Sequence, residues 1–158
     1  MTTAGVPVVH LGDAHGLVEA LATIGFVAVL GHGVPDRDLE AMRRLLVDLF
    51  AVDEIAKRRQ AVERTNYRGF IPLRFFTPNR TDDDGTEPDA FEGYKLHWEC
   101  PPDDQALAEC DLYGANRWPE HLPDMPAVVE SWWAAMDGFV DRLLDGVAPT
   151  IGLDRSVL

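Results

Sequence analysis

Hydrophobic and polar positions in the first part of the chain alternate between strand-like runs and one helical stripe. The β-branched run 6–11 predicts a short strand, with Pro7 at its open end. Asp13 suits the N-cap of a following helix, which Gly25 can end. The apolar positions of this helix recur at helical spacing and are Leu17, Leu21 and Ile24. The near-continuously apolar run 26–30 then predicts a second strand that is covered on both faces.

Three further helices are predicted by apolar stripes. Pro35 and Asp36 suit the start of the first. Its stripe consists of Leu39, Met42, Leu45, Leu46, Leu49 and Phe50. Residues 52–62 predict a short helix with its basic residues late, where they complement the helix dipole. A long helix over about 126–148 carries the widest apolar band, and Pro149 is expected to end it.

The middle of the chain is aromatic and irregular. Residues 66–76 are β-prone, 91–99 predict a strand, and 103–110 predict a short helix. One side of the strand holds Phe91, Gly93, Lys95, His97 and Glu99. Apart from this short helix, four helical segments surround only three or four scattered strands. Because strands need partners and apolar strands need cover, this α+β pattern is typical of one part of a larger sheet.

The length of 158 residues suits a single domain. The net charge of −13 argues against direct binding to nucleic acid or to anionic lipid. Most of the charge lies in residues 82–111, which hold eleven carboxylates against one base, Lys95. The run "TDDDGTEPD" places Gly85 and Glu87 wrongly for a calcium loop, so it is interpreted as a solvated loop.

Cysteine usage and the N-terminus favour a soluble protein of the cytoplasm. Cys100 and Cys110 form no CxxC pair, and reduced thiols are expected. The first twelve residues lack the basic region and apolar core of a signal peptide. No apolar run approaches the length of a membrane span.

The stretch Gly31-His32-Gly33 is the first candidate for chemistry. A P-loop needs GxxxxGK[ST], and a dinucleotide fingerprint needs a third glycine where Asp36 stands, so both phosphate-binding readings fail on spacing. We interpret the two glycines as supplying unusual backbone angles at a strand-to-helix turn. His32 then fills space or bonds to backbone, and it is not expected to ligate iron.

A metal site is a second candidate. On a strand, His97 and Glu99 face the same side, and a distant histidine would complete the facial triad of a non-haem iron site. His121 is the only histidine downstream, and it lies in an irregular segment at short spacing. A strand-exposed histidine with an incidental glutamate is the favoured interpretation.

The segment Asn66-Tyr67-Arg68-Gly69 is the third candidate. It places an arginine and an aromatic residue at the edge of a predicted strand. Such a pair can hold a substrate carboxylate, because the guanidinium is a fork-shaped donor. Surface packing explains the same pair equally well, and the residues alone leave both readings open.

Five segments, in this order, resemble the N-terminal region of the isopenicillin N synthase-like oxygenases: "VPVVHLGD", "LVEALATIGFVAVLGHGVP", "NYRGFIPL", "FEGYKLHWE" and "LYGANRWPEHLPDMPAVVESWWAAM". These are non-haem Fe(II) enzymes, mostly dependent on 2-oxoglutarate. The resemblance covers nearly the whole chain. It implies a double-stranded β-helix (jelly-roll) core, to which residues 1–158 contribute an N-terminal domain of helices and strands.

The resemblance also implies what the chain does not supply. The family holds iron with a His-x-Asp pair and a distal histidine, and grips 2-oxoglutarate with Arg-x-Ser. Neither motif occurs in the sequence, where Arg155 and Ser156 are adjacent. We therefore expect no catalytic or metal-ligating residue here, no Fe(II) or 2-oxoglutarate bound by this chain alone, and a catalytic core supplied by a missing C-terminal segment or a partner chain.

Two functions follow from the resemblance. In the first, the chain is the N-terminal portion of an oxygenase that oxidises a small molecule, in secondary metabolism, with substrate contacts from Tyr67, Arg68 and Tyr94. In the second, it is a catalytically silent domain that acts only by association with a partner. A third hypothesis, from the residues alone, is a self-sufficient metal protein built on His97, Glu99 and His121. With either family reading, the isolated chain is expected to expose apolar surface.

Overall fold

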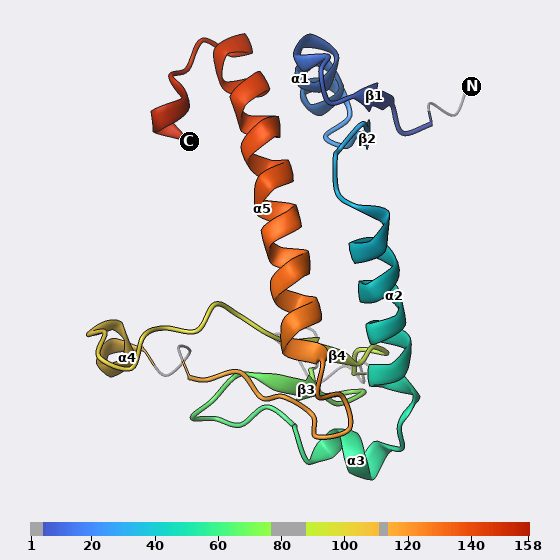
Figure 1. Cartoon of the computed structure of the whole chain (residues 1–158), viewed down its shortest axis with the longest axis vertical. Helices are drawn as coiled ribbons and strands as arrows, with labels where there is room; N and C mark the ends of the chain where they lie inside the picture. Colours follow the sequence, from blue (N-terminus) through green and yellow to red (C-terminus); the bar gives the residue numbers. More distant parts are fainter. Residues whose placement is uncertain (1–4, 77–87, 111–113) are drawn as a thin grey trace, which may run out of the picture. The chain divides into compact units, whose positions relative to one another are not determined.

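The computed structural model describes residues 5–76, 88–110 and 114–158. The chain divides into two compact units: unit 1 comprises residues 1–44 and 127–158, and unit 2 comprises 45–126. The boundaries fall inside helix α2 (Asp36–Ala51) and close to the start of helix α5 (Met125–Thr150) (Figure 1). Most of the predicted acidic loop lies outside the described residues.

Unit 1 begins with a strand–helix–strand unit. Strand β1 (Val8–His10) pairs in parallel with β2 (Ala28–Leu30), and α1 (Ala14–Thr23) connects them. Asp13 caps α1 as predicted, because its Oδ1 accepts a hydrogen bond from the Gly16 amide at 3.0 Å. Gly25 follows the helix with a φ of +81°, which confirms its role in ending it.

The cover predicted for the second strand is wrong. Val29 is half-buried, whereas Leu30 is 56% exposed and Phe26, just before the strand, is 70% exposed. Among the described residues, β1 and β2 alone pair in this sheet, so alternate side chains of β2 lack a covering layer there. The apolar pattern was sufficient to predict a strand, but not a strand with both faces buried.

The first part of α2, up to residue 44, and most of α5 complete unit 1. Pro35 precedes α2 as predicted. Asp38 of α2 is buried and accepts a hydrogen bond from the Ser131 hydroxyl of α5 at 3.0 Å. The buried apolar side chains of the unit are Leu17, Ala20, Val34, Val129 and Ala148.

Helix α5 continues through Pro149, which corrects the expected end. Pro149 lies inside the last turn. The helix ends at Thr150, and Gly152 beyond it has a φ of +76°, while the Leu153 amide donates to the Ala148 carbonyl at 2.9 Å. This is a Schellman ending, which satisfies the last carbonyls of the helix. A short 3₁₀ turn, η2 (Arg155–Val157), follows.

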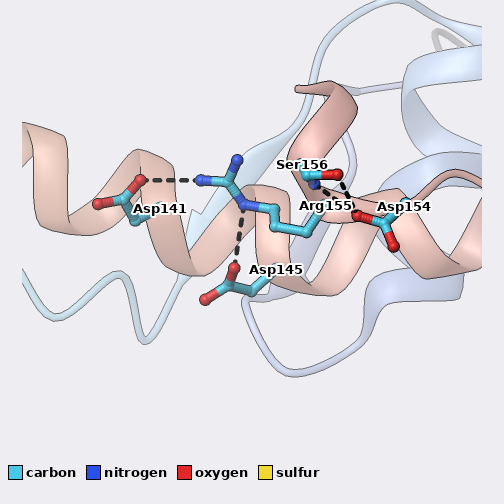
Figure 2. Close-up of polar contacts among 5 residues, drawn as sticks. All are labelled: Asp141, Asp145, Asp154, Arg155 and Ser156. Atoms are coloured by element: carbon cyan, nitrogen blue, oxygen red, sulfur yellow. Dashed lines mark hydrogen bonds and ion pairs between the residues drawn. The ribbon is translucent and has the colours of Figure 1, made fainter.

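The C-terminal turn is tied back to α5 by one arginine. The Arg155 guanidinium donates to Asp141 at 2.9 Å and to Asp145 at 3.0 Å (Figure 2). Asp154 caps the turn by accepting from the amide and the hydroxyl of Ser156. These hydrogen bonds lower the pKa of the Asp154 carboxyl. Arg155 and Ser156 thus have local structural partners.

Unit 2 contains two short helices and a two-stranded sheet. They are α3 (Glu54–Arg58), β3 (Gly69–Ile71), β4 (Gly93–Lys95) and α4 (Ala106–Glu109). Strands β3 and β4 are antiparallel, with Phe70 opposite Tyr94. Helix α3 is shorter than predicted, because the chain folds back after it and Ala61 forms a bridge with Phe70. The predicted helix 103–110 is likewise reduced to α4.

Candidate functional site

In unit 2, the backbone at the start of strand β3 is held against residues 60–62. The Phe70 amide donates to the Gln60 carbonyl at 2.7 Å, and its carbonyl accepts from Val62 at 2.9 Å. Gly69 has a φ of +105°, and a Cβ there would collide with the Gln60 carbonyl oxygen and lie 3.1 Å from the Arg117 side chain. Only glycine fits this close backbone approach. It fixes where the preceding residue, Arg68, enters the fold.

Arg68 is a buried cation with too few partners. Its side chain is among the largest fully buried ones, at 1% exposure. Within the part of the chain that the structure describes, neither its Nε nor its Nη1 has a hydrogen-bond partner. Burial lowers the pKa of the guanidinium, and the nearby Glu99 and Cys110 oppose that shift. Because a guanidinium stays protonated in proteins, these nitrogens are desolvated donors of a positive charge.

Lys95 of β4 lies beside the same segment. Its Nζ is 4.0 Å from the centre of the Tyr67 ring, a cation–π contact. It forms no ion pair with any carboxylate of the described residues. Lys57 of α3 provides a contrast: it lies over the Phe70 ring at 5.3 Å, but it also pairs with Glu92 at 2.6 Å.

A cluster of aromatic rings continues from Tyr67. The Tyr67 ring meets Phe76 edge-on at 6.5 Å between centroids, and Phe76 stacks on Phe91 at 6.2 Å. Phe75 packs edge-on against Phe76 at 4.9 Å. Phe75 and Phe91 are both nearly half exposed. An apolar surface therefore adjoins the Tyr67 ring, over which Lys95 lies.

His97 and Glu99 are held by Asn116 instead of by a neighbouring strand. The buried Asn116 side chain accepts from the His97 amide at 3.0 Å and donates to its carbonyl at 2.6 Å. The Asn116 amide donates to Glu99 Oε1 at 2.9 Å. The side chains of His97 and Glu99 are exposed. Partial desolvation and the charges of Arg68 and Lys95 lower the pKa of His97, which favours a neutral imidazole at neutral pH.

Tyr94 has a different environment from Tyr67. Its hydroxyl donates to the Arg117 carbonyl at 2.8 Å, and burial raises its pKa to about 12. Arg117 in turn donates to the Ala61 carbonyl at 3.0 Å and pairs with Glu63 at 2.8 Å. Neighbouring residues of a strand point to opposite faces, so Tyr94 and Lys95 lie on different sides of β4. The structure thus brings Lys95 to the Tyr67 ring and the charges of Arg68 and Lys95 within range of His97, and it places Tyr94 in another contact network.

The Gly31-His32-Gly33 stretch is a turn, as predicted. Gly31 and Gly33 have φ values of +66° and +70°. The His10 imidazole packs where a Gly31 side chain would lie, and the Arg142 guanidinium would be 2.8 Å from a Cβ at Gly33. His32 Nδ1 accepts from the Val34 amide at 3.0 Å, and its carbonyl accepts from Arg142 at 2.7 Å. His32 therefore bonds to backbone and anchors α5.

The hypothesis of a self-sufficient metal protein is not supported. Among residues 5–76, 88–110 and 114–158, no three histidine, cysteine, aspartate or glutamate side chains are grouped to hold a metal ion. His121 instead lines a pocket of about 420 Å³ with Asp53 and Arg59. His97 and Glu99 have their contacts with Asn116. The described residues do not fit an iron site.

Sequence reasoning selected Tyr67 and Arg68 but missed the contacts of Lys95 and Asn116. Lys95 had a visible signal, because it is the single base in the acidic segment 82–111. Asn116 had none, since its bonds to His97 depend on how two irregular segments meet. Its place in the "NRWPE" segment indicated the family and not this contact.

Comparison with known proteins places the chain in a family. The family described as "non-haem dioxygenase in morphine synthesis N-terminal" matches residues 13–121, well over half of the chain. The chain belongs to this family. The match confirms the resemblance seen in the sequence. No helix in the described part of this domain is long and apolar enough to cross a membrane.

Two longer proteins resemble the domain. Validamycin A dioxygenase from Streptomyces hygroscopicus subsp. limoneus is 27% identical over 135 residues, which are 85% of this chain and 37% of that protein. A 2OG-Fe(II) oxygenase family protein from Caulobacter crescentus has a similar fold, with a TM-score of 0.76 at 20% identity over 98% of this chain and 51% of that one. The chain thus spans about a third to a half of the length of these relatives.

Proposed function

We propose that residues 1–158 form the N-terminal domain of a non-haem Fe(II), 2-oxoglutarate-dependent oxygenase. The family match over residues 13–121 carries this proposal. The fold supports it, since the similar structure is a 2OG-Fe(II) oxygenase family protein. In this proposal a jelly-roll segment or a partner chain holds Fe(II) and 2-oxoglutarate, because the described residues form no metal-holding group.

The proposed substrate is a small molecule of secondary metabolism. The relative named validamycin A dioxygenase supports this class, because its name states a natural product as its substrate. We assign substrate contacts to Tyr67, Arg68 and Tyr94. The first two support the assignment best, since Arg68 has two nitrogens without partners and Tyr67 joins an aromatic cluster. The chain's own contribution is to bind and orient the substrate.

The exposed apolar side chains of unit 1 support association with a further segment. Val8 of β1 is 63% exposed and Leu30 of β2 is 56% exposed, so the two-stranded sheet leaves apolar positions uncovered. Exposed apolar residues gathered on one element indicate a contact surface. In the proposed enzyme this surface packs against the catalytic core.

The experiment that tests the proposal starts from the neighbouring DNA. An adjacent or in-frame segment encoding His-x-Asp, a distal histidine and Arg-x-Ser is expected. Co-expression of that segment with this chain should give Fe(II)-dependent conversion of 2-oxoglutarate to succinate, and omission of this chain should abolish it. Conversion at the same rate without this chain, or the lack of any such segment combined with a stable monomeric chain, would contradict the proposal and favour the silent-domain alternative.

A further inference from the structure

Two cations of unit 2 stand without full partners in a strongly acidic chain. The net charge is −13, yet Arg68 has two nitrogens without hydrogen bonds and Lys95 forms no ion pair with a described carboxylate. Lys57, in the same unit, shows the ordinary outcome, with Glu92 at 2.6 Å and Glu54 at 3.7 Å. Among the described residues, Arg68 and Lys95 are therefore cations without a paired carboxylate, in a chain where carboxylates are abundant, and this is a feature to explain.

The Arg68 side chain opposes folding as it stands. A buried charge without matching hydrogen bonds is strongly unfavourable, and well-packed apolar residues often replace buried ions without loss of stability. Residues that lower the stability of a fold are expected mainly at functional sites. The unpaired nitrogens of Arg68 are therefore suited to an anionic group that arrives with a ligand.

The surroundings of Arg68 indicate how that ligand reaches it. Glu99 acts on the Arg68 charge and Arg68 acts on His97, while both of these side chains are exposed. The Arg68 guanidinium is itself buried, and the exposed His97 and Glu99 side chains lie within range of its charge. Glu99 Oε1 accepts from Asn116, and no hydrogen bond joins this carboxylate to Arg68 Nε or Nη1. An incoming carboxylate can take that place.

We propose that Arg68 and Lys95 form a subsite for a carboxylate carried on an aromatic or similarly flat apolar body. The planar guanidinium matches a carboxylate, and Lys95 adds a second positive charge beside the Tyr67 ring. The exposed rings of Phe75 and Phe91 supply the apolar contact. The inference rests on the proposed function, since the ligand would be the oxygenase substrate, and it names the chemical class of that substrate.

The test uses the complete 158-residue chain and benzoate as the probe. Benzoate and its neutral counterpart benzamide are titrated at low salt, and the backbone amides and the Arg68 Nε–H signal are followed by ¹H–¹⁵N NMR. A ligand of this size is expected to bind with a Kd on the order of a few millimolar. Benzoate should shift the signals of Arg68, Lys95 and His97, and benzamide should bind at least about tenfold more weakly, because it lacks the charge.

Four variants separate the subsite from general effects of charge. Lys95→Met should weaken benzoate binding by about threefold or more. Lys57→Met is the matched control, since Lys57 also lies over a ring but is paired, and its binding should be unchanged. Glu99→Gln keeps the bond from Asn116 and removes a competing charge, so binding should become about two- to fivefold tighter.

Arg68→Met removes the central group. It should abolish detectable benzoate binding while leaving the melting temperature equal or higher, because it replaces an unpaired buried charge by an apolar side chain of similar length. A melting temperature lowered by this change, together with unchanged binding in Lys95→Met, would show that both side chains serve the fold alone and would overturn the proposal.

The remaining outcomes are also decisive. Equal affinity for benzoate and benzamide, or equal losses in Lys95→Met and Lys57→Met, would overturn the subsite. Inorganic phosphate binding more tightly than benzoate would replace the carboxylate by a phosphate and overturn the stated class. None of these readouts uses Fe(II), 2-oxoglutarate or turnover, so a failed subsite and a failed oxygenase assignment give different results.

Discussion

Single glycines determine where several side chains of this protein can lie. At Gly31 the backbone adopts φ of +66° and His10 occupies the space of a side chain. The sequence predicted the turn because glycines between an apolar strand and a charged helix favour such angles. It could not predict His10 as the neighbour, since that contact depends on the parallel pairing of β1 with β2.

Gly31→Ala should destabilise the protein more than Gly25→Ala. Both glycines have positive φ, which costs alanine about 1–2 kcal/mol, but no atom lies within 4 Å of a Cβ at Gly25. The additional decrease in the free energy of unfolding of Gly31→Ala, relative to Gly25→Ala, then measures the cost of displacing His10. Urea unfolding of the two variants checks this, and equal losses would show that backbone strain is the whole effect.

The lowered pKa of His97 makes the stability of the folded protein depend on pH. Its pKa in the folded chain lies below its usual 6.5, so the unfolded chain binds the proton more readily. Stability is therefore expected to fall as the pH drops below about 6.5, through the lowered pKa of the folded state. His97→Gln should remove this part of the pH dependence, as seen by thermal unfolding between pH 7.5 and 5.

The cause of the His97 shift can be tested separately. Lys95→Met removes one of the two cations that face the imidazole, the other being Arg68. NMR titration of the His97 ring should then give a higher pKa than in the unmodified chain. An unchanged pKa would show that Lys95 does not contribute and that desolvation and Arg68 produce the shift.

At the scale of elements, one side chain replaces part of a strand. The sequence predicts a strand over 91–99, but only Gly93–Lys95 pair with β3. Beyond them Asn116 forms both hydrogen bonds that a neighbouring strand would give to His97. The alternation of residue types predicts an extended backbone, and it does not reveal whether a strand or a side chain satisfies it.

Asn116→Ala should release this extended segment. The change leaves the amide and carbonyl of His97 without partners, at a cost of about 1–3 kcal/mol. Asn66→Ala is the comparison, because Asn66 donates one hydrogen bond, to the Ala115 carbonyl at 2.9 Å, and its Oδ1 has no partner. Amide hydrogen exchange at His97 should accelerate only in Asn116→Ala, and equal exchange in both variants would contradict the role of Asn116.

Helix ends show how far local rules extend. Asp13 as a cap and Gly25 as a stop follow from residue types alone, and the structure confirms both. Pro149 was expected to end the long helix, yet a proline in the last turn lacks only one amide bond, and Gly152 with its Schellman bonds sets the true end.

At the scale of the whole molecule, apolar side chains remain exposed on unit 1. Phe26 is 70% exposed and Leu30 56% exposed, although both belong to a run that predicts a buried strand. The hydrophobic pattern indicates which side chains favour burial. It does not indicate which segment or chain packs over them. For this reason the predicted burial of 26–30 is wrong in this structure, while the larger sheet that the pattern indicates stays a prediction.

The isolated chain is accordingly expected to bind a hydrophobic dye or to self-associate. Phe26→Ser should reduce dye fluorescence, because it removes the most exposed ring next to β2. Ile55→Ser is the control: Ile55 is 73% exposed but lies on α3 of unit 2. Dye fluorescence and light scattering after size exclusion measure both effects. A monomer without dye binding would count against a contact surface here.

The division of the chain into units also sets an order for its folding during translation. Unit 1 combines residues 1–44 with 127–158, so its first segment leaves the ribosome long before α5 is made. At ordinary rates of synthesis the interval is roughly 4 to 17 s. Unit 2 is continuous and can fold during that time. The nascent β1–α1–β2 segment therefore waits with Arg142, its tie to the His32 carbonyl, still untranslated, and it is the natural target for chaperones.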